Sequence, residues 1–539
     1  MKWMPHASLG FLAWCLVALP AKGSTPAWAN NVPPEELQRQ ALQHEKAGAW
    51  LAAAELYGEL AKRDVGRMGE WQAKQVVCRK QDRICRRYYS PHVRQHLLSH
   101  RLQDLLNLYE EVLAKLHHHA LVESSPGLYF RKGLSNFHLA VRNPAYCAVL
   151  FPSGIREDLL RDYLQGLWPQ VMNVDILQRK QALRELRSFA LTLEQDLGAN
   201  PSAVVLEFVY ASAESVDEYT EYLPPELVQL MERAERPDVA NVGLGFFVLQ
   251  GQLWISTVQA ASPASQAGLS PHDLILTIDG IPTQAMTVEE AEWRLLGLEG
   301  TSVVLEVADK VGEPSRQVKL TRQKTMTSSV NFRMLDDQQG LGLIALGWFQ
   351  ESTPIEFDEA YLKLQGKGLR GLVLDLRGNP GGLLQAGLQT AERFVPDGVL
   401  ATTRGRTPGA SAVHRANGNF RVSVPVVVLI DQETASAAEI LAAALRDHRR
   451  GVLIGQKSFG KGCTQSLFPL KPGLGALRIT TATWHTPLDD NVGDKGLLPD
   501  LPITERDDIA STDETALDVT KRQLSAAQQK LRQLLAGPN

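Results

Sequence analysis

Hydrophobic positions divide the chain into segments of different periodicity. From about 34 to 235, apolar residues recur three and four positions apart and glycine is rare, as in "RLQDLLNLYEEVLAKL" from Arg101 onward. This spacing gathers apolar side chains on one face and predicts a helical region. The stretch "ALQHEKAGAWLAAAELYGELAKRD" resembles one tetratricopeptide hairpin. A solenoid needs about three such repeats, so we expect a single helical hairpin there.

The pattern changes near residue 238, where short β-rich runs separated by glycine and proline begin and continue to about 325. From about 326 to 505, continuous apolar runs alternate with helical patterns: "LRGLVLDL" precedes "LLQAGLQTAERFV", and "VPVVVLI" precedes "AAEILAAALRDH". Continuous apolar runs are typical of strands buried on both faces. The alternation therefore predicts helices layered on a largely parallel sheet.

The first 29 residues have the pattern of a secretory signal peptide. Lys2 precedes the apolar run "LGFLAWCLVALP", and Ala-Trp-Ala ends at Ala29. The run is shorter than the ~20 residues that a bilayer span needs. We expect cleavage before Asn30 and export to the periplasm, the cell envelope or the medium. An uncleaved N-terminal anchor is the alternative, which leaves contact with the membrane open.

The length of 539 residues exceeds that of one ordinary core and predicts several domains. We expect a signal peptide over 1–29, a helical region over 30–236, a β-rich domain over 237–325, an α/β core over 326–506 and a C-terminal helix or tail over 507–539.

Charge and cysteine content exclude several classes of function. The formal net charge of -4 gives no overall electrostatic basis for a nucleic-acid partner. The basic cluster at positions 79–87 is expected to be a solvated helix face. Four cysteines follow the signal segment, at spacings that fit neither a zinc site nor a disulfide scaffold, so we expect buried thiols. No metal or other cofactor is expected.

The β-rich segment begins with Gly243, Leu244, Gly245 and Phe246, which are followed by "AGL" and "IDG". This ordered set resembles a PDZ domain. In that family the amides of the Gly-Leu-Gly-Phe loop hold the terminal carboxylate of a peptide, which adds a strand to the sheet edge. His272 stands where the family has glycine, and a positive φ there would cost on the order of 1 kcal/mol.

The residues around Ser436 contain the candidates for acyl-transfer chemistry. A serine at the start of a helix is by itself an ordinary N-cap. Acyl transfer needs a nucleophile, a base and donors for the developing oxyanion. A strand-to-helix turn can expose Ser436 while the Ala437 amide faces the same space. The "NPGG" turn after the preceding strand offers a second amide, from Gly382 or Gly381.

Lys461, between two glycines in "SFGKG", is the candidate base. A lysine has a reference pKa of ~10.4 and is protonated at neutral pH. Burial among apolar neighbours lowers that pKa and makes the amine a usable base. Phe459, Leu467 and Phe468 are the expected neighbours.

These motifs together resemble the carboxyl-terminal processing, or tail-specific, serine peptidases. The resemblance covers about 205–505: "TASAAEI", the lysine 25 residues after its serine, "DLRGNPGG" upstream and a PDZ domain before them. It implies a multidomain α/β protein with a crotonase/Clp-protease-like core, and substrates with accessible C-terminal tails. It also implies Ser436 as nucleophile, Lys461 as general base, Gln465 orienting the lysine, and Gly382 and Ala437 as oxyanion donors.

Two details of the sequence do not fit this assignment directly. Gln465 is four residues from Lys461, ~13 Å at full extension, so contact needs a bend, expected at Gly462. The closing loop after "TP" reads "LDD" where the family has Pro-x-Gly. A non-catalytic PDZ-bearing adaptor or chaperone and a crotonase-like acyl-group enzyme are the alternative functions. The oligomeric state is left open.

Overall fold

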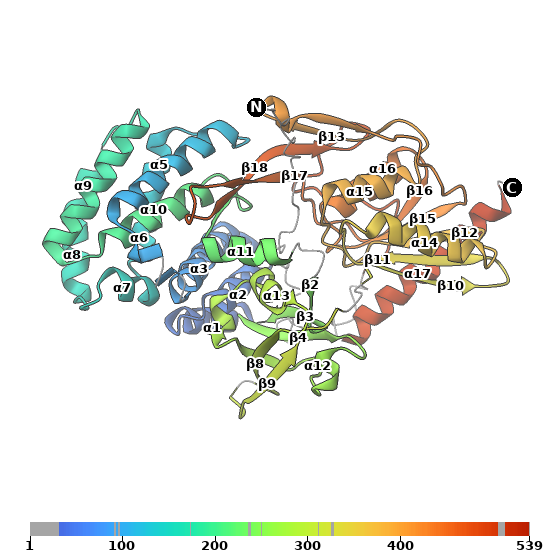
Figure 1. Cartoon of the computed structure of the whole chain (residues 1–539), viewed down its shortest axis with the longest axis horizontal. Helices are drawn as coiled ribbons and strands as arrows, with labels where there is room; N and C mark the ends of the chain where they lie inside the picture. The colour runs from blue at the N-terminus through green and yellow to red at the C-terminus, as the bar shows by residue number, and fades with distance from the viewer. Residues whose placement is uncertain are drawn as a thin grey trace, which may run out of the picture.

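The computed structural model describes residues 32–537 except 91–92, 95–96, 173, 235–238, 250, 311, 325–327 and 505–512. The expected signal peptide lies outside the described residues. Figure 1 shows a helical region on the left, a small β-rich part below and an α/β core on the right. Among the described helices, none has a stretch long and apolar enough to cross a membrane.

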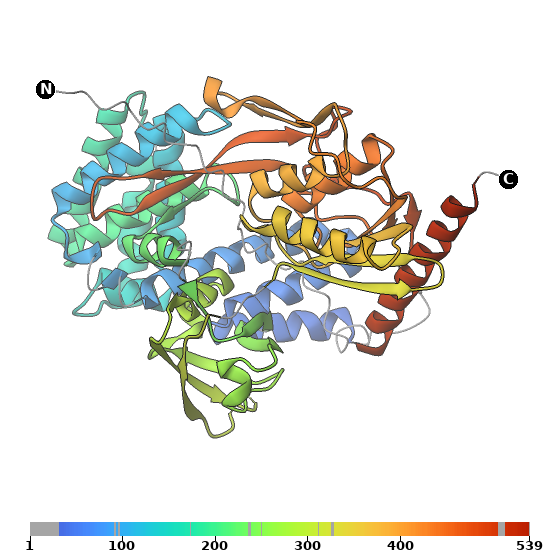
Figure 2. The ribbon, with the colours of Figure 1, turned by 45° about the vertical axis from the view of Figure 1, so that its right-hand side comes forward.

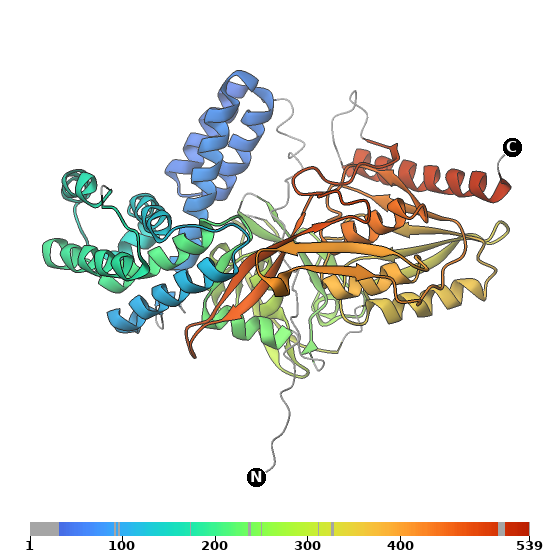
Figure 3. The ribbon, with the colours of Figure 1, turned by 90° about the horizontal axis from the view of Figure 1, so that it is seen from above.

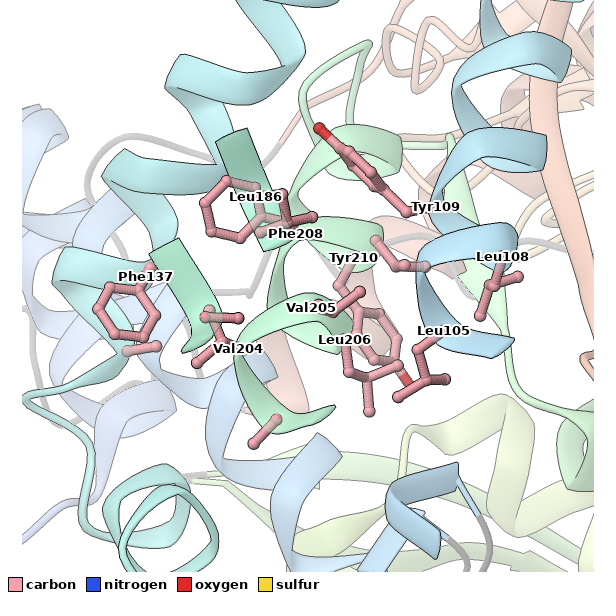
Figure 4. Packing of buried hydrophobic residues seen from close by; sticks show 14 of the residues in the cluster. Leu105, Leu108, Tyr109, Phe137, Leu186, Val204, Val205, Leu206, Phe208 and Tyr210 are labelled. Atoms are coloured by element: carbon pink, nitrogen blue, oxygen red, sulfur yellow. The ribbon is translucent and has the colours of Figure 1, made fainter. Parts of the chain in front are cut away.

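The helical region is built around one buried helix, α10. Every residue of α10 from Ser202 to Ala213 is buried, so this helix packs against several neighbours at once, and Figure 4 shows Val204, Leu206 and Phe208 among side chains from other helices. The helices are α1 (Pro34–Lys46), α2 (Trp50–Arg63), α3 (Met68–Tyr89), α5 (Leu102–His119), α6 (Pro126–Ala140), α7 (Pro144–Leu150), α8 (Glu157–Met172), α9 (Arg179–Leu197) and α10 (Pro201–Glu214), with 3-10 turns at Val65–Arg67 and Leu97–Ser99.

The expected hairpin is formed by α1 and α2, with Gly48 at φ +73° in the turn. Helix α3 packs against this hairpin, and the rings of Tyr57 and Trp71 stack with centroids 6.0 Å apart. Figure 3 shows α1 to α3 projecting from the rest of the molecule.

The basic cluster on α3 is only partly solvated. Arg79 and Arg83 are exposed as expected, but Arg87 is buried. Its guanidinium donates to Glu207 at 2.8 Å and to Glu214 at 2.5 Å. The expectation was wrong for Arg87 because acidic partners on α10 compensate the charge that packing buries.

The β-rich part is an antiparallel sheet in the order β3-β4-β5-β8-β9, with β6 paired to β5. Strand β3 lies at its edge. The elements are β2 (Val239–Ala240), β3 (Leu244–Leu249), β4 (Gln252–Val258), α12 (Pro263–Gln266), β5 (Leu274–Ile278), β6 (Ile281–Pro282), a 3-10 turn (Thr283–Ala285), α13 (Val288–Leu295), β7 (Gly297–Leu298), β8 (Ser302–Ala308) and β9 (Arg316–Thr321). His272 has the positive φ of 72° considered above.

The core contains a six-stranded sheet in the order β10-β11-β12-β15-β16-β19, parallel except for β10. Alternate residues of β12 and β15 pack on opposite sides of the sheet, against α14 to α16 or against α17. Figure 2 shows α17 on one side of the sheet and the other helices of the core on the opposite side. Both faces are therefore buried, which explains the continuous apolar runs. The elements are β10 (Val330–Asp336), β11 (Leu341–Leu346), α14 (Thr353–Gln365), β12 (Gly371–Asp375), α15 (Leu384–Glu392), β15 (Val426–Ile430), α16 (Ala437–Asp447), β16 (Gly451–Gly455), β19 (Leu501–Pro502) and α17 (Asp513–Ala536).

A second, antiparallel sheet was not expected from the sequence. Its order is β1-β18-β13-β14, and β17 also pairs with β18. Its strands are β1 (Glu221–Leu223), β13 (Val399–Gly405), β14 (Ala412–Arg415), β17 (Cys463–Pro469) and β18 (Ala476–His485). The β17–β18 hairpin extends from the core to the helical region, where Leu470, Leu474, Leu477 and Ile479 join the apolar cluster of the helices (Figure 1). Helix α11 (Pro225–Ala234) follows β1 and packs against α13.

The cysteines are less buried than expected. Cys78 is buried, whereas Cys85, Cys147 and Cys463 are half-buried, and none of these four cysteines forms a disulfide within the described chain. Burial raises the pKa of Cys78 to about 12 and that of Cys85 to about 11.

Candidate active site

Ser436 lies in the turn between β15 and α16 and is almost completely buried, with 1% of its surface exposed. Its φ of 55° and ψ of -118° are unusual for a non-glycine residue, and such a conformation costs on the order of 1–3 kcal/mol. The Ser436 N–H donates to Glu439 Oε2 at 2.8 Å, and the Ala435 N–H donates to the Asn379 carbonyl at 2.9 Å. Hydrogen bonds on both sides of the predicted nucleophile thus hold it in a strained conformation.

The Asn-Pro-Gly-Gly turn lies directly against Ser436. It follows β12, which runs parallel to β15, so the carboxyl ends of the two strands are adjacent. Asn379 is fully buried; its Nδ2 donates to the Leu346 carbonyl at 2.9 Å and its Oδ1 accepts from the Gly381 N–H at 2.8 Å. A Cβ on Gly381 would lie 2.8 Å from Ser436 Cβ. Only glycine permits this approach.

Two backbone amides beside Ser436 are available as donors. Gly382 forms a parallel bridge with Phe349, but the two hydrogen bonds of this bridge do not use the Gly382 amide. The Phe349 N–H donates to the Gly381 carbonyl, and the Leu383 N–H donates to the Phe349 carbonyl. Ala437 is the first residue of α16, where amides have no partner within the helix. Among the described residues, neither the Gly382 nor the Ala437 amide has an acceptor. Free, preorganised amides are what oxyanion stabilisation requires.

Lys461 is 1% exposed and lies in the loop between β16 and β17. Its N–H donates to Glu439 Oε2 at 2.9 Å, and its carbonyl accepts from Trp484 Nε1 at 2.7 Å. Gly460 has a φ of +93°, and a Cβ on Gly462 would lie 2.3 Å from the Gly493 nitrogen. The two flanking glycines therefore permit the turn and the close approach of the neighbouring loop.

Glu439 links the serine and lysine segments. Its fully buried carboxylate accepts four hydrogen bonds, from the amides of Ser436, Gly460 and Lys461 and from the Ser458 hydroxyl. Because one oxygen, Oε2, accepts from both Ser436 and Lys461, these two amide nitrogens are less than two hydrogen-bond lengths apart. Burial raises the pKa of Glu439, and the donors act against that increase.

Sequence reasoning gave Glu439 no role, although a signal was present. The run Ser-Ala-Ala-Glu has the Ser-x-x-Glu spacing of a capping box, in which the acid returns to the N-cap amide. The amides of Gly460 and Lys461, by contrast, reach Glu439 only through the tertiary fold.

Tyr219 is the second residue that sequence reasoning missed. Lys461 Nζ lies 5.1 Å from the centroid of the Tyr219 ring. The expected neighbours Leu467 and Phe468 instead pack elsewhere: Leu467 against the cluster of α11 and α13, and Phe468 against His119. They do so because β17 is extended and carries them away from the loop. Tyr219 comes from the segment before β1, and sequence reasoning gave it no role at the site.

Gln465 is fully buried in β17, directly after a bulge. Its Nε2 donates to Cys463 Sγ at 3.3 Å and to Thr480 Oγ1 at 3.2 Å. Its Oε1 is buried and has no hydrogen-bond partner within the described chain. That free acceptor is compatible with the predicted orientation of the lysine, which stays a prediction.

The predicted peptide-binding loop begins the edge strand β3. Gly243 has a φ of +78°, and a Cβ there would lie 2.2 Å from Ser262 Cβ. Its N–H donates to Asn241 Oδ1 at 2.9 Å. Leu244 and Phe246 are half-buried and pack against the core of the sheet. Binding of a peptide by Gly243, Leu244, Gly245 and Phe246 stays a prediction.

The closing loop after "TP" adopts its turn without glycine. Asp489 has a φ of 74°, and its N–H donates to the Thr486 carbonyl at 2.9 Å. Aspartate tolerates this left-handed conformation better than most residues. The departure from the family pattern is thus accommodated locally.

Comparison with known proteins identifies two families in the chain. The family model "Peptidase family S41" matches residues 340–503, and a "PDZ domain" model matches residues 254–309. The carboxyl-terminal-processing protease of Synechocystis sp. is 39% identical over 291 residues, which cover 53% of this chain and 68% of that protein. The protein of the same name from Picosynechococcus sp. is 38% identical over 293 residues, covering 54% of this chain and 70% of the relative.

Among solved structures, the photosystem II D1 C-terminal processing protease matches with a TM-score of 0.44 and 24% identity, covering 78% of this chain and 96% of that one. The relatives from Synechocystis sp. and Picosynechococcus sp. are matched over more than two thirds of their own length. This chain therefore belongs to the carboxyl-terminal-processing proteases of peptidase family S41, serine peptidases that carry a PDZ domain.

Proposed function

We propose that the protein is an exported endopeptidase that captures the C-terminal tails of protein substrates with its PDZ domain and cleaves them with a Ser436/Lys461 dyad. The observation that carries the dyad is the shared anchor: one oxygen of Glu439 accepts hydrogen bonds from the backbone amides of both residues. The loops of the nucleophile and the base are thereby held in one fixed relation.

Acylation begins when neutral Lys461 takes the hydroxyl proton of Ser436 while Oγ attacks the carbonyl carbon of the scissile peptide bond. The amides of Gly382 and Ala437 donate to the oxygen of the tetrahedral intermediate. The Lys461 ammonium then gives its proton to the leaving amine, and the remaining acyl group is an ester of Ser436. Loss of one such donor costs about 10²- to 10³-fold in turnover in serine peptidases.

Deacylation repeats these steps with water as the nucleophile. Lys461 takes a proton from the water that attacks the ester, and it returns this proton to Ser436 Oγ as the ester bond breaks. Both steps need Lys461 as the neutral amine, and its side chain is withdrawn from water, with 1% of the residue exposed. Gln465 Oε1 is the acceptor that would orient the ammonium between the steps.

Tail capture rests on the loop before β3. Amides in the Gly243–Phe246 loop would hold the free carboxylate, and the tail would pair with the exposed edge of β3. The half-buried Leu244 and Phe246 favour tails with apolar side chains.

One comparison tests cleavage and tail capture together. An unfolded substrate and its C-terminally amidated twin are incubated with wild-type protein and with Ser436→Ala, and fragments are identified by mass spectrometry. We expect wild type to cleave the free acid, to cleave the amide much more slowly, and Ser436→Ala to cleave neither. Binding without cleavage by wild type would favour an adaptor or chaperone. Equal rates for acid and amide would remove carboxylate capture and leave proteolysis intact.

A further inference from the structure

The amine of Lys461 faces an aromatic ring from a distant part of the chain. The 5.1 Å between Nζ and the centroid of Tyr219 is within the ~6 Å over which an ammonium is attracted to a ring face. Lys461 is 1% exposed and Tyr219 is half-buried, and desolvation strengthens this attraction.

Backbone and side-chain hydrogen bonds fix the position of Tyr219. Asp217 Oδ1 accepts from the amides of Tyr219 at 2.9 Å and Thr220 at 2.7 Å, which makes a tight turn. The buried Thr220 hydroxyl then accepts from the Thr480 amide at 3.1 Å. Thr480 is the residue opposite Gln465 in the β17–β18 ladder. The ring is therefore tied to the hairpin that begins directly after the lysine loop.

We propose that Tyr219 is a positioning residue for the base, whose ring face holds Lys461 Nζ and stabilises the ammonium that forms when the amine takes the Ser436 proton. This inference rests on the proposed dyad. It assigns a role at the active site to the segment that joins the helical region to the core. The ring acts on the charged state formed during acylation, where stabilisation accelerates the reaction.

The phenol acts through its ring face and not as an anion. Burial and the neighbouring Glu218 carboxylate raise the pKa of Tyr219, so the hydroxyl stays protonated at working pH. The ionisable groups around the pair come from four elements: Glu439 on α16, Glu218 beside Tyr219, Cys463 on β17, and Asp494 in the loop after β18. These groups are the same in all the variants described below, so a difference in the pH profile between variants shows the effect of the Tyr219 ring.

The test measures kcat and kcat/KM from pH 5 to 10 for wild type, Tyr219→Phe and Tyr219→Leu. Activity rises with pH as Lys461 loses its proton. A ring that stabilises the ammonium raises the apparent pKa of this rise, so its loss should move the rise to lower pH by about 0.5 to 1.5 units. The activity that Tyr219→Leu reaches at high pH should be about 2- to 30-fold lower than that of wild type, which is the effect of losing one cation–π contact. Tyr219→Phe keeps the ring and should retain the wild-type profile.

Tyr222→Leu is the matched control, since Tyr222 lies on the same segment and its hydroxyl donates to the Leu474 carbonyl at 2.9 Å. It should leave the midpoint of the rise in place. An unchanged midpoint in Tyr219→Leu would overturn the proposal even if the plateau fell, because a purely structural residue gives that result. Equal shifts in Tyr219→Leu and Tyr222→Leu, or a Phe variant that behaves like the Leu variant, would also overturn it.

Should Tyr219→Leu fail to fold, isosteric rings decide the question. Phenylalanine and 3,4,5-trifluorophenylalanine at position 219 have nearly the same shape but differ in the negative potential of the ring face. The fluorinated ring should lower the midpoint, and identical midpoints would count against a cation–π role. Lys461→Arg, measured in the same assay, tests the dyad itself. An active Lys461→Arg enzyme would rule out the dyad. An inactive Lys461→Arg enzyme, together with a wild-type pH profile for Tyr219→Leu, would rule out only the role of Tyr219.

Discussion

At the scale of single residues, the site depends on conformations that are costly outside this fold. Ser436 has a positive φ without being glycine, and Lys461 has its amine buried. Glu439 accepts hydrogen bonds from the backbone amides of both residues, which holds the two loops in place, and a hydrogen bond of this kind contributes about 0.5–1.5 kcal/mol. A strained residue at a candidate nucleophile is an observation from which function is inferred, and here it coincides with the residue that the motif indicates.

The sharpest residue-scale prediction concerns the charge of Lys461. Arginine keeps a positive charge and a similar length, but it cannot release a proton at working pH. Lys461→Arg should therefore fold and bind tails yet lose about 10²- to 10⁴-fold in turnover, the scale of general-base catalysis. Circular dichroism, tail-binding affinity and kcat check the three parts. Near-normal turnover in a folded variant would remove Lys461 from the mechanism.

At the scale of elements, the β17–β18 hairpin connects the helical region with the candidate active site. One end follows Lys461, and the other packs Leu474 and Leu477 into the helical cluster. Helix α5 ends on the same hairpin, where His119 stacks on Phe468 with ring centroids 4.1 Å apart and the Leu121 N–H donates to the Thr480 carbonyl at 2.9 Å. Partial burial, together with His118, Lys115 and Arg406, lowers the pKa of His119.

This contact should weaken in acid. Because the folded-state pKa of His119 is below its unfolded value of ~6.5, the unfolded chain takes up the proton more readily, and stability falls as pH drops below that value. His119→Phe keeps an aromatic stack without a proton. Its free energy of unfolding should therefore rise relative to wild type between pH 7 and 5 in urea titrations. His117→Phe, at an exposed position of the same helix, is the control, and parallel pH curves for His119→Phe and wild type would contradict the prediction.

At the scale of the whole molecule, the segment after the helical region contacts both the core and the PDZ domain. The core supplies Ser436 and Lys461, the segment after the helical region supplies Tyr219, and α11 packs against α13 of the PDZ domain through Leu230, Met231 and Trp293. Arg294 on α13 donates to Glu226 on α11 at 2.8 Å, which adds an ion pair to this interface. The PDZ domain is thus joined through α11 to β1, the strand that pairs with β18.

We predict that the whole chain is exported and that its signal peptide is cleaved. The short apolar run and the Ala-Trp-Ala site predict that the mature protein begins at Asn30. N-terminal sequencing of protein recovered from the periplasm or the medium checks this directly. A first residue of Met1 in that material would contradict cleavage and favour the anchored alternative.

The sequence alone determined the features that depend on local pattern. The helical region, the strands of the parallel sheet and the start of α16 after Ser436 could be predicted, because periodicity and chain turns reflect interactions between near neighbours. The Gly-Leu-Gly-Phe loop and the Asn-Pro-Gly-Gly turn were likewise visible, because close backbone approach requires glycine at particular positions.

Only the tertiary structure decided which distant segments meet. Residues far apart in sequence form the antiparallel second sheet and the buried ion pair of Arg87 with Glu207 on α10. The same holds for Glu439, which accepts a hydrogen bond from the distant amide of Lys461. Tyr219 is the clearest case: its own segment is an ordinary turn, and its chemistry exists only because β1 pairs with β18 beside the lysine loop. Local pattern carries no record of such contacts, because their free energy comes from packing that forms only when the whole chain is folded.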